Sequence, residues 1–281
     1  MPLGIARHII TEYSASAWSP ATDITTAIWI DASDTSSYSL SGSDVTAVTD
    51  KGDAGATFTV GGTPSTSTTL NSLNTFTFDE GSNEDLTTDE VHQASSGNHW
   101  AIGVWQWNSV NDTKDSFWST ENNTVNAVTN KRDYAVSSGD NSNFNGEVDL
   151  DSLSGNRIST TIGDKEEFTT TFGSSNTWRI LGVFFNKAGN QIGARLNGAN
   201  AFTPVNDYDN SLTPSLDLRI MRNRTSIRMS GKMAEFFSVA NVPGTGGTDI
   251  STFEKAEGYL AHKWGLTSNL PSDHPYKSSA P

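Results

Sequence analysis

The sequence contains no cysteine, no long apolar run and no dense cluster of Lys or Arg. Without cysteine, the chain has no disulfide, no thiol catalysis and no thiolate metal site. No apolar run approaches the length that a membrane span requires. Because no basic stripe is present, the sequence predicts no nucleic-acid partner. The net charge of −14 instead indicates a chain kept in solution by self-repulsion.

Hydrophobic residues are also scarce, at 34%, yet the chain has 8 Trp and 13 Phe. We therefore expect a few large aromatic rings to supply much of the core. Ser and Thr are abundant, which favours strands and turns over helices. At 281 residues the chain fits one large β domain. No repeat or change of composition divides it, so we predict an arm over residues 1–17 and one domain over residues 18–281.

Strand patterns recur along most of the chain. Residues 99–110 and 178–185 are apolar on both faces, which predicts central strands of a sandwich. Residues 191–196 return after a turn and end at Asn197-Gly198, a strong tight-turn signal. Further strands are predicted at residues 27–31, 57–60, 75–78, 216–221 and 232–239. The polar segment 111–175 predicts short strands with long loops.

The end of the chain predicts one amphipathic helix over residues 251–265 and a docked tail. Apolar residues recur with a helical period at Phe253, Ala256, Leu260 and Trp264. Ser251 and Glu254 have the spacing of a capping box, and Gly265 is the expected C-terminal stop. A lone helix after many strands predicts a clasp on a β-sheet domain.

The same residues carry a resemblance to a known family. Glu257-Gly-Tyr-Leu-Ala-His-Lys-Trp-Gly265, then Leu270-Pro271 and His274-Pro-Tyr-Lys277, resemble the C-terminal signature of LamG-like, concanavalin A-like jelly-roll domains. Trp18-Ser-Pro20 and Ile28-Trp-Ile-Asp-Ala-Ser-Asp34 are similar to the opening of those domains. Asp50-Lys-Gly52 resembles a further element of those domains, but Val48 stands two residues before it where the family usually has Trp. The resemblance implies an all-β jelly-roll sandwich with a C-terminal helical clasp and an N-terminal extended arm.

Such domains are common in marine phage particle proteins, so the resemblance implies a non-enzymatic structural protein of a tailed phage, as capsid decoration or as a tail or fibre component. Other virion proteins would be its partners, within a homo-oligomer or larger assembly. Residues 1–10 lack the pattern of a secretion signal, which agrees with assembly in the host cytoplasm. The arm would attach through Leu3, Ile5, Ile9 and Ile10, since an apolar arm needs a covering partner. Packing on its own domain is the alternative.

A second hypothesis is a carbohydrate-binding module for a host or cell-surface glycan. Jelly rolls present sheet faces and loop rims suited to this. Trp118, Tyr134 and Tyr208 stand in polar surroundings and are candidates to stack on sugar rings. A place in the core is the alternative for each ring.

A third hypothesis is a glycoside hydrolase, because Glu147-Val-Asp149-Leu-Asp151 resembles the catalytic strand of laminarinase-type enzymes. Alternate strand residues share a face, and a retaining enzyme needs two carboxyls about 5–5.5 Å apart. Asp151 is one methylene shorter than the family's Glu, and the surroundings lack aromatic residues. We therefore predict no enzyme, with Glu147 and Asp151 as the acid pair if the alternative holds.

The acidic loop over residues 79–90 offers the oxygen ligands that Ca²⁺ prefers. Asp79, Glu84 and Asp85 are the candidate ligands, although the spacing does not fit an EF-hand. A solvated run of charge is the alternative. The sequence predicts no other cofactor.

Overall fold

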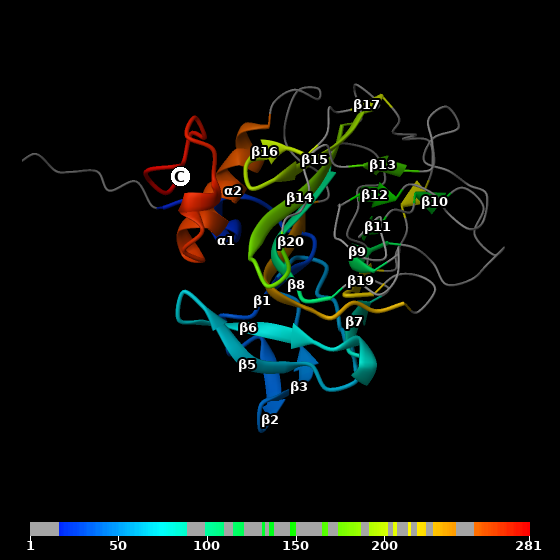
Figure 1. Ribbon diagram of the computed structural model, residues 1–281. Helices are drawn as coiled ribbons and strands as arrows, with labels where there is room; N and C mark the ends of the chain where they lie inside the picture. The colour runs from blue at the N-terminus through cyan, green and yellow to red at the C-terminus, as the bar shows by residue number, and fades with distance from the viewer. Residues whose placement is uncertain are drawn as a thin grey trace, which may run out of the picture.

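Two β-sheets and a C-terminal helix form the fold of the computed structural model (Figure 1). The structure describes residues 17–88, 99–109, 115–120, 131–132, 135–137, 147–149, 165–167, 174–186, 191–201, 205–206, 213–214, 218–222, 227–239 and 250–281. The helical elements are α1 (Pro20–Asp23), α2 (Ser251–Lys263) and the 3-10 turns η1 (Glu80–Ser82) and η2 (Thr267–Asn269). Strands dominate the rest, so the predicted all-β sandwich is confirmed.

The larger sheet has eleven strands. Its path runs β16 (Ala199–Asn200), β15 (Gln191–Leu196), β14 (Arg179–Asn186), β8 (His99–Trp107), β20 (Gly231–Val239), β6 (Leu73–Phe78), β5 (Ser65–Leu70), β3 (Asp44–Val48) and β2 (Tyr38–Ser41). Two more strands join it: β1 (Trp29–Asp31) pairs with β20, and β17 (Val205–Asn206) pairs with β15.

The smaller sheet has seven strands. Its order is β13 (Lys165–Glu167), β12 (Glu147–Asp149), β11 (Ala135–Ser137), β9 (Ser116–Ser119), β19 (Leu218–Ile220), β7 (Asp85–Thr88) and β4 (Thr59–Gly61). A separate pair, β10 (Lys131–Arg132) and β18 (Thr213–Pro214), is parallel. The segment 111–175 thus contributes only short strands to the described structure, as its polar composition predicts.

Three long strands, β14, β8 and β20, form the centre of the larger sheet. β8 pairs antiparallel with both neighbours, and all nine of its residues are buried. This confirms the two predicted central strands, because a strand covered on both faces must be apolar on both. The return strand β15 also matches its prediction, and Asn197 and Gly198 have the positive φ values, 52° and 83°, that a tight turn needs.

Large aromatic rings fill the main core between the two sheets. Trp105 of β8 lies with its ring centre 5.4 Å from that of Trp118 on β9 and 5.7 Å from that of Phe236 on β20. Residues of both sheets complete this cluster. The aromatic-rich composition is therefore explained by a core built from a few large rings.

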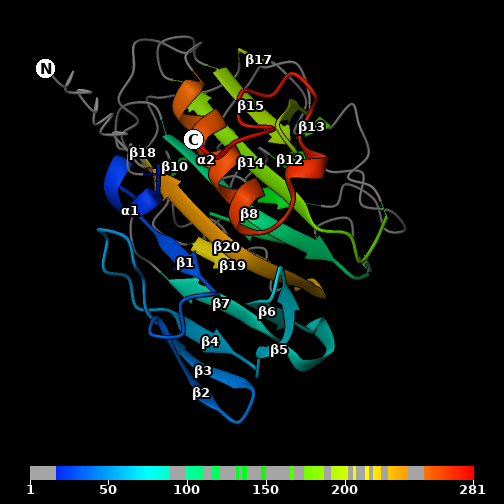
Figure 2. The ribbon, with the colours of Figure 1, turned by 90° about the vertical axis from the view of Figure 1, so that its left-hand side faces the viewer.

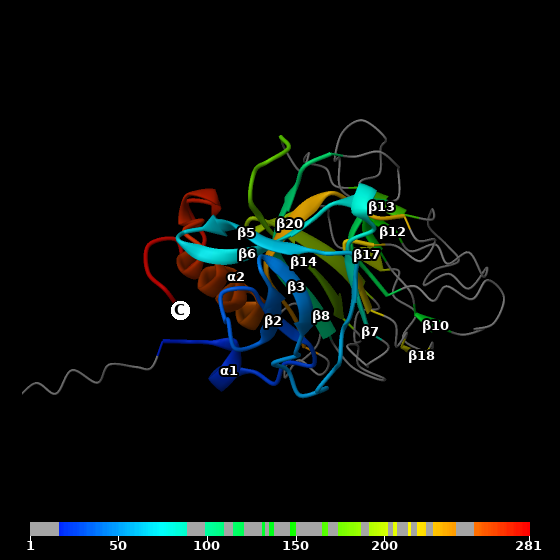
Figure 3. The ribbon, with the colours of Figure 1, turned by 90° about the horizontal axis from the view of Figure 1, so that it is seen from below.

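A second apolar layer lies between the outer face of the larger sheet and α2. Trp100, Ile102 and Val104 of β8 face this layer, and Phe253 and Leu260 approach from α2. Figure 2 shows α2 lying across the central strands, and Figure 3 shows it on the side away from the seven-stranded sheet. The order of layers is therefore tail and α2, larger sheet, core, smaller sheet.

Helix α2 begins at the predicted residue but differs from its prediction in its N-cap and in its last residue. Ser251 is the first helical residue, and Ile250 occupies the N-cap position without a side-chain hydrogen bond. The predicted capping box is therefore wrong. The helix ends at Lys263, two residues earlier than predicted, while Gly265 has a φ of +70° and stops the helix as expected.

The first and last described residues lie side by side. The backbone N–H of Trp18 donates to the carbonyl oxygen of Pro281 at 3.1 Å. The candidate attachment residues Leu3, Ile5, Ile9 and Ile10 lie outside the described residues.

Candidate functional site

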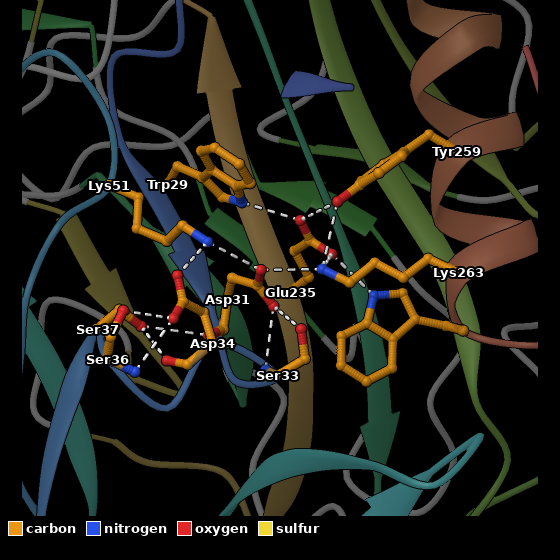
Figure 4. Close-up of polar contacts among 11 residues, drawn as sticks. Trp29, Asp31, Ser33, Asp34, Ser36, Ser37, Lys51, Glu235, Tyr259 and Lys263 are labelled. Atoms are coloured by element: carbon orange, nitrogen blue, oxygen red, sulfur yellow. Dashed lines mark hydrogen bonds and ion pairs between the residues drawn. The ribbon is translucent and has the colours of Figure 1, made fainter. Parts of the chain in front are cut away.

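A polar cluster is buried between the larger sheet and α2. Antiparallel pairing of β1 with β20 places Asp31 opposite Glu235, so both acids project toward the side that α2 covers. We call the clasp cluster the following residues: Trp29, Asp31, Ser33, Asp34, Ser36, Lys51, Glu235, Tyr259, Lys263 and Trp264. Figure 4 shows side chains of β1, β20 and α2 converging, with Ser33, Asp34, Ser36 and Lys51 reaching them from the loops that follow β1 and β3.

Four donors surround the Glu235 carboxylate, which is fully buried. Its Oε1 accepts hydrogen bonds from Trp29 Nε1 at 2.9 Å and from the Tyr259 hydroxyl at 3.2 Å. Its Oε2 accepts from Lys263 Nζ at 2.7 Å and from Trp264 Nε1 at 2.9 Å. Burial outweighs these donors and raises the pKa of Glu235. Burial and the charge of Glu235 also raise the pKa of Tyr259, so its hydroxyl keeps its proton.

Asp31 links this buried acid to the surface. Lys263 Nζ lies 2.9 Å from Asp31 Oδ2, and Lys51 Nζ lies 3.1 Å from the same oxygen. Ser33 donates to Asp31 Oδ1 from its backbone N–H at 3.0 Å and from its hydroxyl at 2.6 Å. Burial opposes ionisation of Asp31, but the charge of Lys263 and the bonds from Ser33 together outweigh it and lower the pKa of Asp31.

Asp34 forms the outer end of the chain of charges. Its Oδ2 lies 2.7 Å from Lys51 Nζ, and its Oδ1 accepts from the Ser36 hydroxyl at 2.6 Å. The hydrogen bond from Lys51 is the main cause that lowers the pKa of Asp34 to about 2, and Ser36 adds to it. Charges therefore alternate in sign from the buried Glu235 to the half-exposed Asp34.

A second buried cluster fastens the tail to the β15–β16 hairpin. Arg195 of β15 donates through Nε and Nη2 to the two oxygens of Glu257, at 2.8 and 2.9 Å. This two-pronged geometry is the strongest form of an arginine–carboxylate pair. His274 Nδ1 accepts from the Tyr276 backbone N–H, which leaves Nε2 to donate to Glu257 at 3.1 Å. Burial opposes the charge of Arg195, but Glu257 outweighs it and raises the pKa of Arg195.

The remaining residues of the C-terminal motif also make packing contacts. A Cβ at Gly258 would lie 2.5 Å from Tyr276 Cβ, so only glycine lets the tail cross α2 this closely. His262 Nε2 lies 3.0 Å from the Tyr276 carbonyl oxygen. Lys277 Nζ donates to three carbonyl oxygens at the end of η2. The motif that carries the family resemblance therefore acts by closing the fold, and its acids are directed at the protein's own donors.

Trp118 was predicted as a ring that stacks on sugar, and the structure shows this prediction to be wrong. Its side chain is fully buried, and β9 places it opposite Ile220 of β19 on the core side. Its polar neighbours suggested exposure, but in a strand they belong in part to the opposite face. Tyr134 and Tyr208 lie outside the described residues.

The candidate Ca²⁺ ligands Asp79, Glu84 and Asp85 all bond to the protein's own donors. Asp79 accepts from the Gly81 N–H as the N-cap of η1, and Glu84 accepts from the Asp79 N–H at 2.7 Å. Burial raises the pKa of Glu84, and Asp85 pairs with Arg228. Over the ranges that the structure describes, no three His, Asp or Glu side chains gather as metal ligands would. These contacts stabilise the loop around η1.

The predicted acid pair of a glycosidase is only partly within the described structure. Glu147 lies on β12, which pairs with β11 and β13 in the seven-stranded sheet. Asp151 lies outside the described residues. The acid pair stays a prediction.

Sequence reasoning assigned Asp31 and Glu235 to strands but did not select them as site residues. The signal was present for Glu235, because it is the one acidic residue in the apolar strand β20. A charge in such a position must meet a partner, since an unpaired buried charge is very costly. For Asp31 no such signal exists, because its strand is only three residues long.

Comparisons with known proteins agree with this fold. No protein-family model matches the sequence, and no curated protein matches it. The binding domain of botulinum neurotoxin DC in complex with SialylT matches with a TM-score of 0.52 at 9% identity, over 84% of this chain and 51% of that one. The botulinum neurotoxin serotype G binding domain matches at 0.50, with 13% identity over 83% and 51%.

An arabinofuranosidase complexed with arabinofuranosyl-alpha-1,2-xylobiose also matches, with a TM-score of 0.51 and 11% identity over 80% of this chain and 50% of that one. The chain therefore spans about half the length of these solved structures. At such low identity the likeness establishes the fold, a jelly-roll sandwich, and not an activity. In the described part of the chain, neither α-helix is long and apolar enough to cross a membrane.

Proposed function

We propose that this chain is a lectin-like module that binds carbohydrate on the side of its seven-stranded sheet. The supporting observation is the asymmetry of the sandwich. The C-terminal helix and tail cover the outer face of the larger sheet, whereas within the described residues no helix packs on the seven-stranded sheet. Among the described elements the seven-stranded sheet is therefore a side without a covering helix, and we place the ligand there.

Three polar side chains point away from the core across that sheet; Thr87 is half-buried, Arg219 is 8% exposed and Ser119 is fully buried. In β19, Leu218 and Ile220 belong to the core, so Arg219 between them points the other way. The register places Arg219 opposite Thr87 of β7 and Ser119 of β9. The Ser119 hydroxyl donates to the Arg222 carbonyl oxygen at 3.0 Å, so a sugar would reach this group of side chains chiefly at the half-buried Thr87 and at the edge of Arg219. A few such polar groups can fix the orientation of a ligand.

The structural neighbours add support from the fold. Two neighbours are named as binding domains of neurotoxins, one of them in complex with SialylT, and a third is a glycosidase with its oligosaccharide. These ligands belong to those proteins. Their common fold accommodates glycans, which makes a glycan the first ligand class to test here.

The test is a glycan array probed with the purified chain, with and without Ca²⁺. We expect binding to one glycan class that weakens by about tenfold or more in Arg219→Gln, because a hydrogen bond to a charged group is worth about 1.5–3 kcal/mol. Lys255→Gln on α2, on the covered side, serves as the control and should bind as the wild type does. Absence of any signal, with and without Ca²⁺, overturns the proposal.

A second candidate function is a structural component of a tailed-phage particle, attached through residues 1–17. The position of Trp18 beside Pro281 supports it, because the arm then joins the domain on the helix-covered side, away from the proposed glycan face. We expect deletion of residues 1–17 to abolish incorporation into particles and leave glycan binding intact. Unchanged incorporation would rule out attachment through this arm.

Neither role requires catalysis. The glycosidase alternative is tested by assaying hydrolysis of β-glucans by the wild type and by Glu147→Gln. We expect no hydrolysis by either chain. Hydrolysis that is lost in Glu147→Gln would replace the binding proposal with an enzymatic one.

A further inference from the structure

An amine lies between two carboxylates in the clasp cluster. Lys263 Nζ is 2.9 Å from Asp31 Oδ2 and 2.7 Å from Glu235 Oε2. The centres of the Tyr259 and Trp264 rings lie 5.5 and 5.2 Å from the same nitrogen. Glu235 is fully buried, and Asp31 is nearly so. We propose that Lys263 and Asp31 become joined by an isopeptide bond, a covalent cross-link between α2 and β1. This inference does not depend on the glycan-binding proposal.

The hydrogen bonds around Asp31 distinguish its two oxygens. Oδ1 accepts two hydrogen bonds from Ser33, which is the arrangement that stabilises negative charge on the oxygen of a tetrahedral intermediate. Oδ2 faces the two lysines: it accepts a hydrogen bond from Lys51 Nζ at 3.1 Å and is the oxygen that can take a proton from Lys263 Nζ at 2.9 Å. Oδ1 therefore stays as the amide oxygen, and Oδ2 is the oxygen that leaves.

Glu235 provides the proton transfers that amide formation needs. First, a proton moves from Lys263 Nζ to Asp31 Oδ2, which leaves a neutral amine beside a carboxylic acid. Nζ then attacks Cγ of Asp31, and Glu235 takes the proton that Nζ loses. Glu235 returns this proton to Oδ2, the bond between Cγ and Oδ2 breaks, and water leaves. One N–C bond forms, one C–O bond breaks, and Glu235 ends in the protonation state in which it began.

The lowered pKa of Asp31 opposes the first proton transfer, whereas other features of the surroundings favour the attack of Nζ and the loss of water. Burial raises the pKa of Glu235, which makes its carboxylate a better base for the proton on Nζ. The rings of Trp29, Tyr259 and Trp264 limit access of water, which would otherwise favour the free acid and amine. The reacting groups are already in contact, so little ordering is required.

Lys51 also contacts Asp31 Oδ2, but it is a weaker candidate for the bond. Its second carboxylate is Asp34, whose pKa of about 2 makes it a poor proton acceptor. Lys51 instead provides a positive charge that supports the attacked carboxyl group. The cross-link is thus assigned to Lys263, which alone contacts both Asp31 and Glu235 among the described lysines.

The test is the intact mass of the full chain under denaturing conditions, followed by peptide mapping. We expect a mass lower by one water molecule and a branched peptide that joins Asp31 to Lys263. A full unmodified mass after prolonged incubation at neutral pH overturns the proposal. A water loss mapped elsewhere, such as to a succinimide, to Lys51 or to Glu235 as the bonded acid, overturns it equally.

Two variants test the assigned roles. Lys263→Arg keeps the positive charge but has no amine to form the bond, so the full mass should return, whereas Lys255→Arg on the same helix should stay one water lighter. The Glu235→Gln side chain keeps the shape of glutamate and one acceptor oxygen but cannot take a proton. We therefore expect formation of the isopeptide bond to slow by at least tenfold. An unchanged rate in Glu235→Gln overturns the role of Glu235. Near-ultraviolet circular dichroism establishes that each variant is folded.

Discussion

At the scale of single residues, the buried acid Glu257 of α2 depends on the side chains that pair with it. Glu257 has two guanidinium bonds from Arg195 and one bond from His274, and all three side chains are nearly fully buried. If one of these three side chains is removed, the other two keep their charged or polar groups but have no partner and no water at the buried site. The stability of the clasp is therefore sensitive to single substitutions that leave the apolar core untouched.

The Glu257→Ala variant is expected to lower the free energy of unfolding by about 3–5 kcal/mol, the usual cost of leaving a buried charge unpaired. Denaturant titration followed by tryptophan fluorescence measures this. Glu254→Ala is the matched control, since Glu254 lies 3.7 Å from Arg195 at a more exposed position and its loss should cost about 1 kcal/mol or less. Equal effects of the two substitutions would contradict the assigned geometry.

Trp118 provides a second prediction at this scale. Since its ring is in the core against Trp105 and Phe236, Trp118→Ala should cost about 3–5 kcal/mol of unfolding free energy. Trp118→Phe should cost much less and should leave any glycan binding unchanged. Loss of glycan binding in a stable Trp118→Phe variant would restore the stacking role that the structure contradicts.

The pKa of Asp34 predicts how stability changes with acid. It is about 2 in the folded protein against 3.8 ordinarily, so the folded state binds the proton more weakly than the unfolded state. The stabilising contribution of Asp34 is full above about pH 5 and is lost as the pH falls toward about 2. The raised pKa of Glu235 changes the stability with pH in the opposite direction. The contribution of Asp34 must therefore be measured as a difference in stability between variants.

We expect Lys51→Met, which removes the main cause of the shift, to be destabilised at neutral pH and to approach the wild type as the pH falls to about 2. Urea midpoints over this range, compared between the two chains, measure the difference. A destabilisation that does not change with pH would show that Lys51 acts through packing alone.

At the scale of elements, α2 and the tail act as one unit. The helix covers Trp100, Ile102 and Val104 on the outer face of the larger sheet, and the tail in turn crosses α2 at Gly258. The helix is amphipathic, as its sequence period indicates, but the tail covers part of its polar side. An element covered on both sides depends on close contact, so small changes in volume have large effects.

Gly258→Ala is the sharpest test of this arrangement. The added methyl group would meet Tyr276, so we expect the tail to detach or shift at a cost of about 1–3 kcal/mol. Limited proteolysis after residue 270 and denaturant titration measure the two effects. In the background of Tyr276→Gly, which removes Cβ as well as the ring, the same substitution should cost clearly less, because the clash is gone. Additive effects would contradict the contact.

At the scale of the whole molecule, the two outer faces of the sandwich have different surroundings. One face of the larger sheet is closed by α2, the tail and the clasp cluster, and both described chain ends lie there. The seven-stranded sheet lies at the other side, where Thr87, Arg219 and Ser119 point away from the core although Arg219 and Ser119 are buried. The proposed functions follow this division, with closure and attachment on one side and ligand binding on the other.

The sequence by itself determined the local elements. Central strands such as β8 and β14, the turn at Asn197 and Gly198, and α2 could be predicted, because each depends on a period or a turn residue read within a short window. Ser/Thr-rich strands such as β5 escaped prediction, since β5 has only half-buried and exposed positions and so shows little apolar contrast.

Only the tertiary structure decided which residues meet. Asp31, Glu235 and Lys263 lie on β1, β20 and α2, and their contact depends on strand order and register rather than on any local pattern. The same holds for Trp118, whose burial follows from the pairing of β9 with β19. A side chain's neighbours across a sheet come from distant parts of the chain, so period and composition could not place them.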